Sequence, residues 1–342
     1  MKKVANNLIN HTMKQLFSIL AITISFFANS QNVTVGRTSI HIKGEFLECC
    51  LKAVLLKEDK KTIVKTWGFF VNAPTQKLVL EGFPKNVSDT PVTYYLSLTK
   101  DGDTLVNKEK VVIKRVQTNE SITCRNYNTG TKIETPFKLN YLIYYPEYYF
   151  HDQSIKAPLL LTFHGDGQKG TNELYKLRGT YIPQKIDAGM LPNFIVVSPQ
   201  TNGSKPKWTN KFWYKELLDS LYAKGIDTSE VYISGYSGGG AGITTYANNH
   251  KVAGVASFSP VLTSTASSTG ACVLKDARIW AFHCANDATI NPNITRNFVS
   301  NVKKCPSTKP VRMSMYPTGG HNPFSQALKT DSVFKFLSGE ID

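Results

Sequence analysis

The stretch VYISGYSGGGAG, residues 231–242, joins an apolar strand pattern to a glycine-rich turn around Ser237 and a run of small residues. A short apolar run bounded by turn residues is typical of a buried strand, and the small residues after the turn are predicted to form a helix. The order Gly235-Tyr236-Ser237-Gly238-Gly239 between a strand and a helix is that of a nucleophile elbow, which lifts a serine hydroxyl above the end of a sheet. The flanking glycines permit this sharp turn because they carry no Cβ. The stretch therefore predicts an α/β sheet with a candidate nucleophile, Ser237.

The residues on either side of this stretch, from about 126 to 342, alternate between apolar strands and helices. The strand patterns are KLNYLIYY, APLLLTFHG, NFIVVSP, VAGVASFSP, ARIWAFHC and VRMSMYP, with helices such as FWYKELLDSLYAKG and ITRNFVSNVKK among them. Near-continuous apolar strands separated by helices are typical of a mostly parallel sheet that is covered by helices on both faces. We therefore expect residues 126–342 to form the catalytic domain.

A serine hydroxyl needs a base to remove its proton and a carboxylate to orient that base. His321 lies in the glycine-rich segment PTGGHNP after the last strand pattern, and Asp287 lies in FHCANDATINP, just after the pattern ARIWAFHC. Catalytic side chains gather at the carboxyl ends of strands in open parallel sheets. The order Ser237, Asp287, His321 is that of α/β-hydrolases. Asp276 and Asp331 are rival acids, but neither follows a strand end as directly.

The negative oxygen that forms during attack on an ester needs N–H donors, and removal of one donor typically costs roughly 2.7 to 4 kcal/mol. One candidate donor is the amide of Gly238, the residue after the nucleophile. The other lies on the loop FHGDGQKG, residues 163–170, after the third strand of the sheet. There we favour the amide of Asp166, with Gly165 or Gly167 as alternates.

These motifs resemble those of the secreted esterases of the α/β-hydrolase superfamily, near the polyhydroxybutyrate depolymerase, feruloyl esterase and predicted peptidase groups. The likeness rests on YLIYYPEYY, FHGDG, IDTSEVYISGYSGGGAG, IWAFHCANDATINP and GGHN, and it covers about residues 130–340. Two positions depart from the family pattern. Cys284 stands where the family often has Gly, and Gly238 replaces the commoner Met after the nucleophile. Neither departure removes a catalytic atom, and both bear on the shape of the pocket.

Other aromatic and histidine side chains lie close to these motifs in the sequence. Trp208 and Tyr236, with Trp213, are candidates for an aromatic wall that binds an aryl or polymeric substrate, although core packing is at least as well supported for Trp213 on its helix. We interpret His164 as shaping the oxyanion loop and His283 as supporting the acid strand by hydrogen bonding. The sequence has neither the spacing of a zinc site nor a phosphate loop, so we expect no metal and no cofactor.

Residues 31–125 have a different pattern, a series of short strands such as TSIHIKG, LKAVLLKE, KTIVKTWGFFV and QKLVLEGF. The runs TYYLSLTK and KVVIKRV, on either side of Asp101-Gly102-Asp103, predict a hairpin. Several such strands predict an immunoglobulin-like β-sandwich. A sandwich of this kind in front of a catalytic domain resembles the arrangement of known secreted esterases. The polar, turn-rich residues near 119 to 136 mark the expected boundary between the two halves.

Residues 1–30 have the order of a secretory signal peptide: lysines, the apolar run LFSILAITISFF, and small residues before Gln31. An apolar core of about a dozen residues is shorter than the roughly 20 that a helix needs to span a bilayer. We therefore expect a secreted or periplasmic protein with no stable membrane anchor.

All six cysteines follow residue 30, where an oxidising compartment permits disulfides. Cys272 and Cys305 both precede consecutive strands at the same end of the sheet, and we expect these two to pair. Neighbouring residues of a strand point to opposite faces, so one of Cys49 and Cys50 is expected to pair with Cys124.

The chain has 342 residues, with 40 Lys and Arg against 25 Asp and Glu, and a formal net charge of +15. This balance favours contact with an acidic polysaccharide, a wall polymer or a membrane surface. The lysines are scattered and form no basic stripe with interleaved aromatics, so we expect no nucleic-acid partner.

Together these patterns predict a secreted serine carboxylic-ester hydrolase that forms an acyl-enzyme. The expected substrates are small acyl esters or esters of plant or microbial polymers. Two other functions stay open, a serine peptidase that uses the same three residues and a non-catalytic protein that binds polymers through a hydrolase fold. A peptidase would release amines from peptides, whereas a binding protein would retain its polymer after loss of Ser237.

Overall fold

The computed structural model describes most of the chain after residue 31. The described residues are 32–35, 39–46, 49–71, 75–81, 91–113, 117–125, 136–151, 154–190, 192–204, 207–262, 270–307 and 309–342. The signal peptide expected at residues 1–30 therefore lies outside the described residues. Within the ranges above, no helix is both long enough and apolar enough to cross a membrane.

The chain divides into two compact units, Met1–Arg115 and Val116–Asp342. This division differs from the boundary that we expected near residue 125. The reason is the segment Gln117–Cys124, most of which falls in the polar stretch near 119 to 136 that we expected to be the boundary. It forms a strand that pairs antiparallel with Phe137–Tyr144 in the sheet of the second unit.

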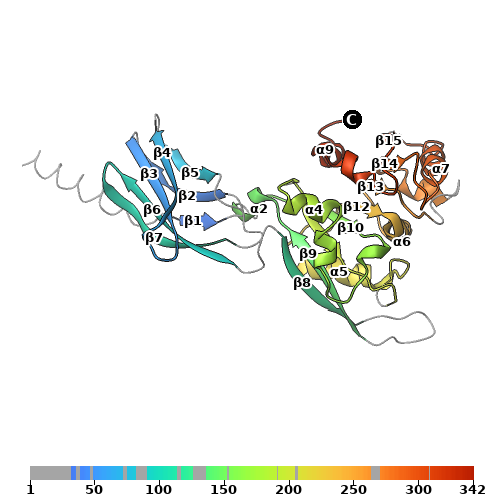
Figure 1. Ribbon diagram of the computed structural model, residues 1–342, viewed down its shortest axis with the longest axis horizontal. Helices are drawn as coiled ribbons and strands as arrows, with labels where there is room; N and C mark the ends of the chain where they lie inside the picture. The colour runs from blue at the N-terminus through green and yellow to red at the C-terminus, as the bar shows by residue number, and fades with distance from the viewer. Residues whose placement is uncertain are drawn as a thin grey trace, which may run out of the picture. The chain divides into compact units, whose positions relative to one another are not determined.

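The described residues of the first unit form two antiparallel sheets that share one hydrophobic core (Figure 1). Their strands are β1 (Asn32–Val35), β2 (Ser39–Phe46), β3 (Cys49–Leu56), β4 (Ile63–Val71), β5 (Thr75–Glu81), β6 (Val92–Lys100) and β7 (Asp103–Ile113). The sheets have the orders β1-β2-β5 and β4-β3-β6-β7. Alternate apolar residues such as Ile42, Leu55 and Leu96 are fully buried between neighbours from both sheets. The expected hairpin is confirmed, because β6 and β7 pair across residues 101 and 102.

In the described residues of the second unit, one mixed sheet of eight strands organises the fold. Its strands are β8 (Gln117–Cys124), β9 (Phe137–Tyr144), β10 (Leu159–Phe163), β11 (Ile195–Pro199), β12 (Val231–Tyr236), β13 (Gly254–Phe258), β14 (Arg278–Cys284) and β15 (Val311–Tyr316). They lie in the order β15-β14-β13-β12-β10-β11-β9-β8. Strands β10 to β15 pair in parallel, whereas β9 is antiparallel to both of its neighbours. The mostly parallel sheet expected from the sequence is confirmed.

Helices cover both faces of this sheet. They are α2 (Glu147–His151), α3 (Tyr175–Arg178), α4 (Tyr181–Asp187), α5 (Phe212–Ala223), α6 (Gly240–Ala247), α7 (Asn293–Val302), α8 (Phe324–Ala327) and α9 (Ser332–Ser338), with short 3-10 turns η1 (Asp166–Gln168), η2 (Ser237–Gly239) and η4 (Gly270–Leu274). Leu159 and Leu161 of β10 enter one hydrophobic cluster with α5, α6 and α7. Leu160 enters a second cluster with α4, α8 and α9. Successive residues of a strand face opposite sides, so each strand contributes to both cores.

A disulfide joins Cys272 in η4 to Cys305 after α7, with the two Cα atoms 5.5 Å apart, which confirms the pairing expected for these residues. Cys50 and Cys124 are free thiols, and Cys124 is fully buried in a core cluster of the second unit. The expected bridge from Cys49 or Cys50 to Cys124 is therefore wrong. Cys124 ends β8, and its side chain packs among apolar neighbours instead.

Candidate active site

Ser237 stands at the tight turn between β12 and α6, at the carboxyl end of the parallel strands. Its φ of 51° lies in the left-handed region, which is strained for a residue with a Cβ and is typical of functional turns. A Cβ on Gly239 would overlap the carbonyl group of Phe163, so only glycine allows the turn to approach β10 this closely. The Ser237 carbonyl accepts a hydrogen bond from the N–H of Val261 at 2.8 Å. The strand, turn and helix expected around Ser237 are confirmed.

His321 lies on the loop after β15 and brings its imidazole to Ser237. The distance from His321 Nε2 to Ser237 Oγ is 2.8 Å, and the distance from His321 Nδ1 to Asp287 Oδ2 is also 2.8 Å. An Nδ1–H that donates to the carboxylate leaves Nε2 free to accept the serine proton. The structure thus brings the three residues selected from the sequence into one hydrogen-bonded chain.

Asp287 is buried just after β14 and accepts several hydrogen bonds. Its Oδ1 accepts the backbone N–H groups of Thr289 at 2.8 Å and Ile290 at 3.0 Å, while Oδ2 faces His321. Burial acts to raise the pKa of this carboxyl, but the hydrogen bonds from His321 and the two amides outweigh it and hold the pKa below its usual value. Asp287 is therefore a carboxylate at neutral pH.

A second imidazole, that of His283, contacts the same carboxylate from the buried side. His283 Nε2 lies 3.0 Å from Asp287 Oδ2 and 3.1 Å from the carbonyl oxygen of Ile290, and Nδ1 lies 2.7 Å from Thr295 Oγ1. Both neighbours of Nε2 are acceptors, so we assign the hydrogen to Nε2 and let Nδ1 accept from the Thr295 hydroxyl. Burial lowers the pKa of His283, which keeps the ring neutral. The hydrogen-bonding support expected from His283 is confirmed.

The loop after β10 carries one candidate oxyanion donor, the amide of Asp166, and lies beside the other candidate, Gly238, in the turn after β12. Thr201 donates its N–H to His164 Nε2 at 3.0 Å, so His164 Nδ1 carries the hydrogen and donates it to the Gly165 carbonyl oxygen at 2.6 Å. The C=O and the next N–H of a trans peptide point in opposite directions, so this bond also fixes the direction of the Asp166 N–H. The Asp166 nitrogen lies 3.6 Å from the point that a Cβ on Gly238 would occupy.

Two side chains that the sequence analysis did not select hold the loops of the site. Asn286 Oδ1 accepts the N–H of Gly320 at 2.9 Å, beside the loop histidine. Gln200 Nε2 donates to the carbonyl oxygens of Gln168 and Glu173, both at 3.0 Å. Asn286 directly precedes Asp287 in the sequence, and this position could have indicated its role in the site. Gln200 acts on residues far away in the sequence, so no local pattern could have identified it.

The two aromatic candidates occupy different positions. Tyr236 is partly exposed, and its ring centroid lies 5.2 Å from that of His321. Trp208 is only 5% exposed, and its indole N–H donates to the His164 carbonyl oxygen at 3.1 Å while its ring packs edge-on against the His164 ring. Trp208 thus supports the oxyanion loop from behind and does not form the open wall that we expected. Trp213 is fully buried, as core packing requires.

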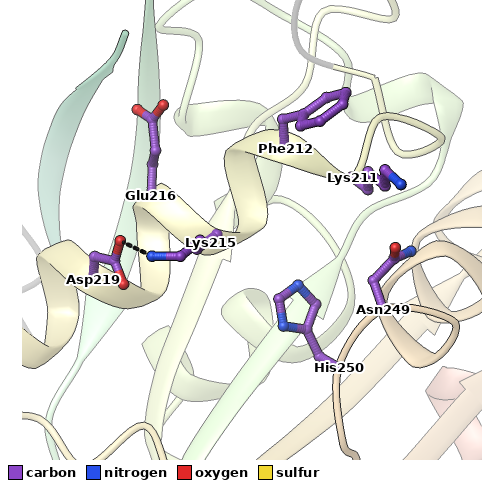
Figure 2. Close-up of a pocket in the computed structure, with 7 residues that line it drawn as sticks. All are labelled: Lys211, Phe212, Lys215, Glu216, Asp219, Asn249 and His250. Atoms are coloured by element: carbon purple, nitrogen blue, oxygen red, sulfur yellow. Dashed lines mark hydrogen bonds and ion pairs between the residues drawn. The ribbon is translucent and has the colours of Figure 1, made fainter. Parts of the chain in front are cut away.

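A separate pocket of about 400 Å³ lies between α5 and the end of α6 (Figure 2). It is lined by Lys211, Phe212, Lys215, Glu216, Asp219, Asn249 and His250. Figure 2 shows the ion pair between Lys215 and Asp219 on α5, whose atoms Nζ and Oδ2 are 2.6 Å apart. None of the site residues selected from the sequence lines this pocket, so its charged groups lie outside the chain formed by Ser237, His321 and Asp287.

Comparison with known proteins finds partial similarity to esterases. Residues 177–339 match the family model of the phospholipases and carboxylesterases. The chain is 28% identical over 171 residues to the bifunctional acetylxylan esterase/xylanase XynS20E of Neocallimastix patriciarum. This match covers 47% of the chain and 24% of the relative, so the chain spans about a quarter of the length of that curated relative.

Similar solved structures include a thermostable esterase and a ferulic acid esterase, each 16% identical in sequence. The alignment with the thermostable esterase covers 89% of this chain and 95% of the esterase chain, with a TM-score of 0.49. The alignment with the ferulic acid esterase covers 65% of this chain and 98% of that esterase chain, with a TM-score of 0.46. The partial family match and the order of the sheet support an α/β-hydrolase fold for the second unit.

Proposed function

We propose that this protein is a serine carboxylic-ester hydrolase in which Ser237 is the nucleophile, His321 the general base and acid, and Asp287 the group that orients the imidazole. The observation that carries this proposal is the pair of 2.8 Å contacts that join His321 to Ser237 Oγ and to Asp287 Oδ2. A buried carboxylate, an imidazole and a serine on a strained turn form the arrangement that activates a serine hydroxyl.

In the first half of the reaction His321 Nε2 removes the proton from the Ser237 hydroxyl as Oγ attacks the ester carbonyl carbon. The carbonyl oxygen becomes negative and accepts hydrogen bonds from the amides of Gly238 and Asp166. His321 then gives its proton to the leaving alcohol oxygen, and the acyl group stays on Ser237. Asp287 holds the imidazolium in place during this step.

In the second half a water molecule takes the place of the alcohol. His321 removes a proton from the water, and the resulting oxygen attacks the acyl carbon of the ester on Ser237. The same two amides bind the second oxyanion. When the intermediate collapses, His321 returns the proton to Ser237 Oγ and the carboxylic acid leaves.

Esters are the proposed substrates because the matched family is that of phospholipases and carboxylesterases. The relative named as an acetylxylan esterase supports esters that are attached to a polysaccharide, alongside small acyl esters. The net charge of +15 favours a substrate or surface with acidic groups.

We also propose that the protein is exported and that its first unit is an immunoglobulin-like sandwich. Export is supported by the order of residues 1–30 and by a disulfide in the second unit. The sandwich is supported by the two antiparallel sheets that the described part of this unit forms, with three and four strands around one apolar core. Sequencing the N-terminus of the purified protein tests export. Thermolysin digestion tests whether the first unit is a compact domain.

The test of the reaction is labelling of the purified mature protein with a fluorophosphonate probe, followed by assays with short-chain nitrophenyl esters. We expect labelling of the wild type, no labelling of Ser237→Ala, and a loss of turnover of roughly 10⁴-fold or more in that variant. Asp287→Asn should retain labelling at a much lower rate, because the imidazole then takes the wrong tautomer. A folded wild type that neither labels nor hydrolyses any ester would contradict the proposal.

A further inference from the structure

The carboxylate of Asp166 lies against the residue that follows the nucleophile. A Cβ on Gly238 would stand 2.5 Å from Asp166 Oδ1, which is closer than side-chain atoms pack, and 3.1 Å from Asp166 Cγ. Gly238 therefore leaves the space that this carboxylate occupies. The carboxylate thus lies beside Gly238, the residue that follows Ser237, and close to the two amides proposed as oxyanion donors.

The charge of Asp166 has a near counter-ion in Lys169. Lys169 Nζ lies 2.9 Å from Asp166 Oδ1, and a Cβ on Gly203 would stand 3.0 Å from Lys169 Cδ, so the lysine chain lies directly on that glycine. The Asp166 side chain is 69% exposed and the Lys169 side chain 38%. The pair thus presents a carboxylate and an ammonium group to solvent next to the site.

The fold gains little from this pair, because exposed ion pairs contribute little to stability. A carboxylate beside the oxyanion donors also opposes the negative charge that develops there. Lys169 is placed to neutralise that carboxylate. An acid at this position is therefore unfavourable for the chemical step by itself, and a contribution to substrate binding would offset the disadvantage.

We propose that Asp166 and Lys169 bind a hydroxyl group close to the scissile ester, so that esters of polyols or of hydroxy acids are preferred over plain alkyl esters. On the acyl side this hydroxyl stands on the carbon next to the carbonyl, and on the alcohol side it stands on the carbon next to the one that bears the ester oxygen. A hydroxyl group both donates and accepts hydrogen bonds, which matches a carboxylate acceptor beside an ammonium donor. A cationic substrate matches less well, because Lys169 already neutralises the acid. This inference rests on the proposed ester hydrolysis at Ser237.

Two pairs of esters of equal size test the inference on the purified full chain. The first pair, 2-hydroxyethyl acetate and propyl acetate, exchanges a hydroxyl for a methyl group on the alcohol side. The second pair, ethyl glycolate and ethyl propionate, makes the same exchange on the acyl side. We expect kcat/KM to be at least about tenfold higher for the hydroxylated ester of one pair, because a site built to bind a hydroxyl rejects the analogue that lacks it. The pair that shows the preference identifies the side of the ester that Asp166 contacts.

The preference should disappear in Asp166→Ala. Asp219→Ala is the matched control, because Asp219 is also an exposed acid in an ion pair but lines the separate pocket of Figure 2. The control should keep the wild-type rates and the wild-type preference. Lys169→Met should lower kcat for both esters of a pair, because it leaves the carboxylate unneutralised beside the developing oxyanion. Fluorophosphonate labelling of each variant reports whether Ser237 is still activated.

Equal rates for both esters of each pair in the wild type would overturn the inference, and so would a preference that persists in Asp166→Ala. A wild type that hydrolyses propyl acetate but shows no hydroxyl preference would leave the esterase proposal standing. A wild type that neither labels nor hydrolyses any of the four esters would refute the esterase proposal and this inference with it.

Discussion

His283 Nε2 lies 3.0 Å from Asp287 Oδ2, the same carboxylate oxygen that His321 Nδ1 approaches at 2.8 Å. Two imidazoles therefore share one oxygen, and both determine where the carboxylate stands. His283→Asn removes the donor at the Nε2 position, whereas His283→Gln places an amide N–H close to it. We expect kcat for a nitrophenyl ester to fall about tenfold to a hundredfold in the Asn variant, with KM little changed, because a misplaced carboxylate misorients the base.

The Gln variant should recover most of that loss in kcat. Thr295→Val is a second check, because it removes the hydroxyl that bonds His283 Nδ1 while keeping the shape of the side chain. Its kcat should fall less than that of His283→Asn. Equal kcat values in the wild type and the Asn variant would mean that His283 has a purely structural role.

His164 is expected to act on catalysis through the Gly165 carbonyl that it bonds at 2.6 Å. His164→Leu removes this bond and frees the peptide that carries the Asp166 N–H. His164→Asn keeps a donor near the Nδ1 position. We expect kcat to fall roughly a hundredfold in the Leu variant, the usual cost of losing one oxyanion donor, and much less in the Asn variant. The two variants would have the same kcat if His164 only filled space.

The free energy of unfolding is also expected to depend on His164. Burial lowers the pKa of His164 from 6.5 to about 4. Between these pH values the unfolded chain binds a proton that the folded protein does not, so stability falls as the pH decreases from about 6.5 to about 4 and then levels off. This group contributes roughly 3 kcal/mol to that decline. Urea midpoints should therefore fall less steeply over this interval in His164→Asn than in the wild type, and parallel curves would contradict the assignment.

The Cys272–Cys305 disulfide spans 33 residues of sequence, so its loss enlarges the conformational freedom of the unfolded chain. The double variant with Cys272→Ala and Cys305→Ala should lose about 4 kcal/mol of unfolding free energy, measured by urea denaturation. Adding a reductant should lower the midpoint of the wild type and leave that of the double variant unchanged. A wild-type midpoint that does not respond to complete reduction would contradict this prediction.

The elbow and its two partners could be predicted from the sequence because each of them lies in the segment that follows an apolar strand. Parallel strands bring their carboxyl ends to one edge, so residues far apart in sequence meet there without any knowledge of side-chain packing. Strand-end position also separated Asp287 from the rival Asp331, which forms an ion pair with Lys335 at 3.0 Å.

The parts that could not be predicted depend on contacts between distant segments. Trp208 is buried because it packs against His164, which lies 44 residues earlier in the chain, and an aromatic residue in a loop looks the same in sequence whether it is buried or exposed. The polar sequence of β8 likewise gave no indication that one of its polar side chains is buried. Gln117 is fully buried, and its side-chain amide donates to the Pro183 carbonyl oxygen and to Asp187 Oδ1.

Because β8 is the outermost strand of the second unit's sheet, a truncated protein that starts at residue 126 would leave β9 as an exposed edge. Unpaired N–H and C=O groups on such an edge pair readily with another chain, so we expect this fragment to aggregate in size-exclusion chromatography. A fragment that starts before Gln117 keeps the edge strand and should stay monodisperse. The second unit can therefore be joined to other modules with its edge strand intact when the junction precedes Gln117.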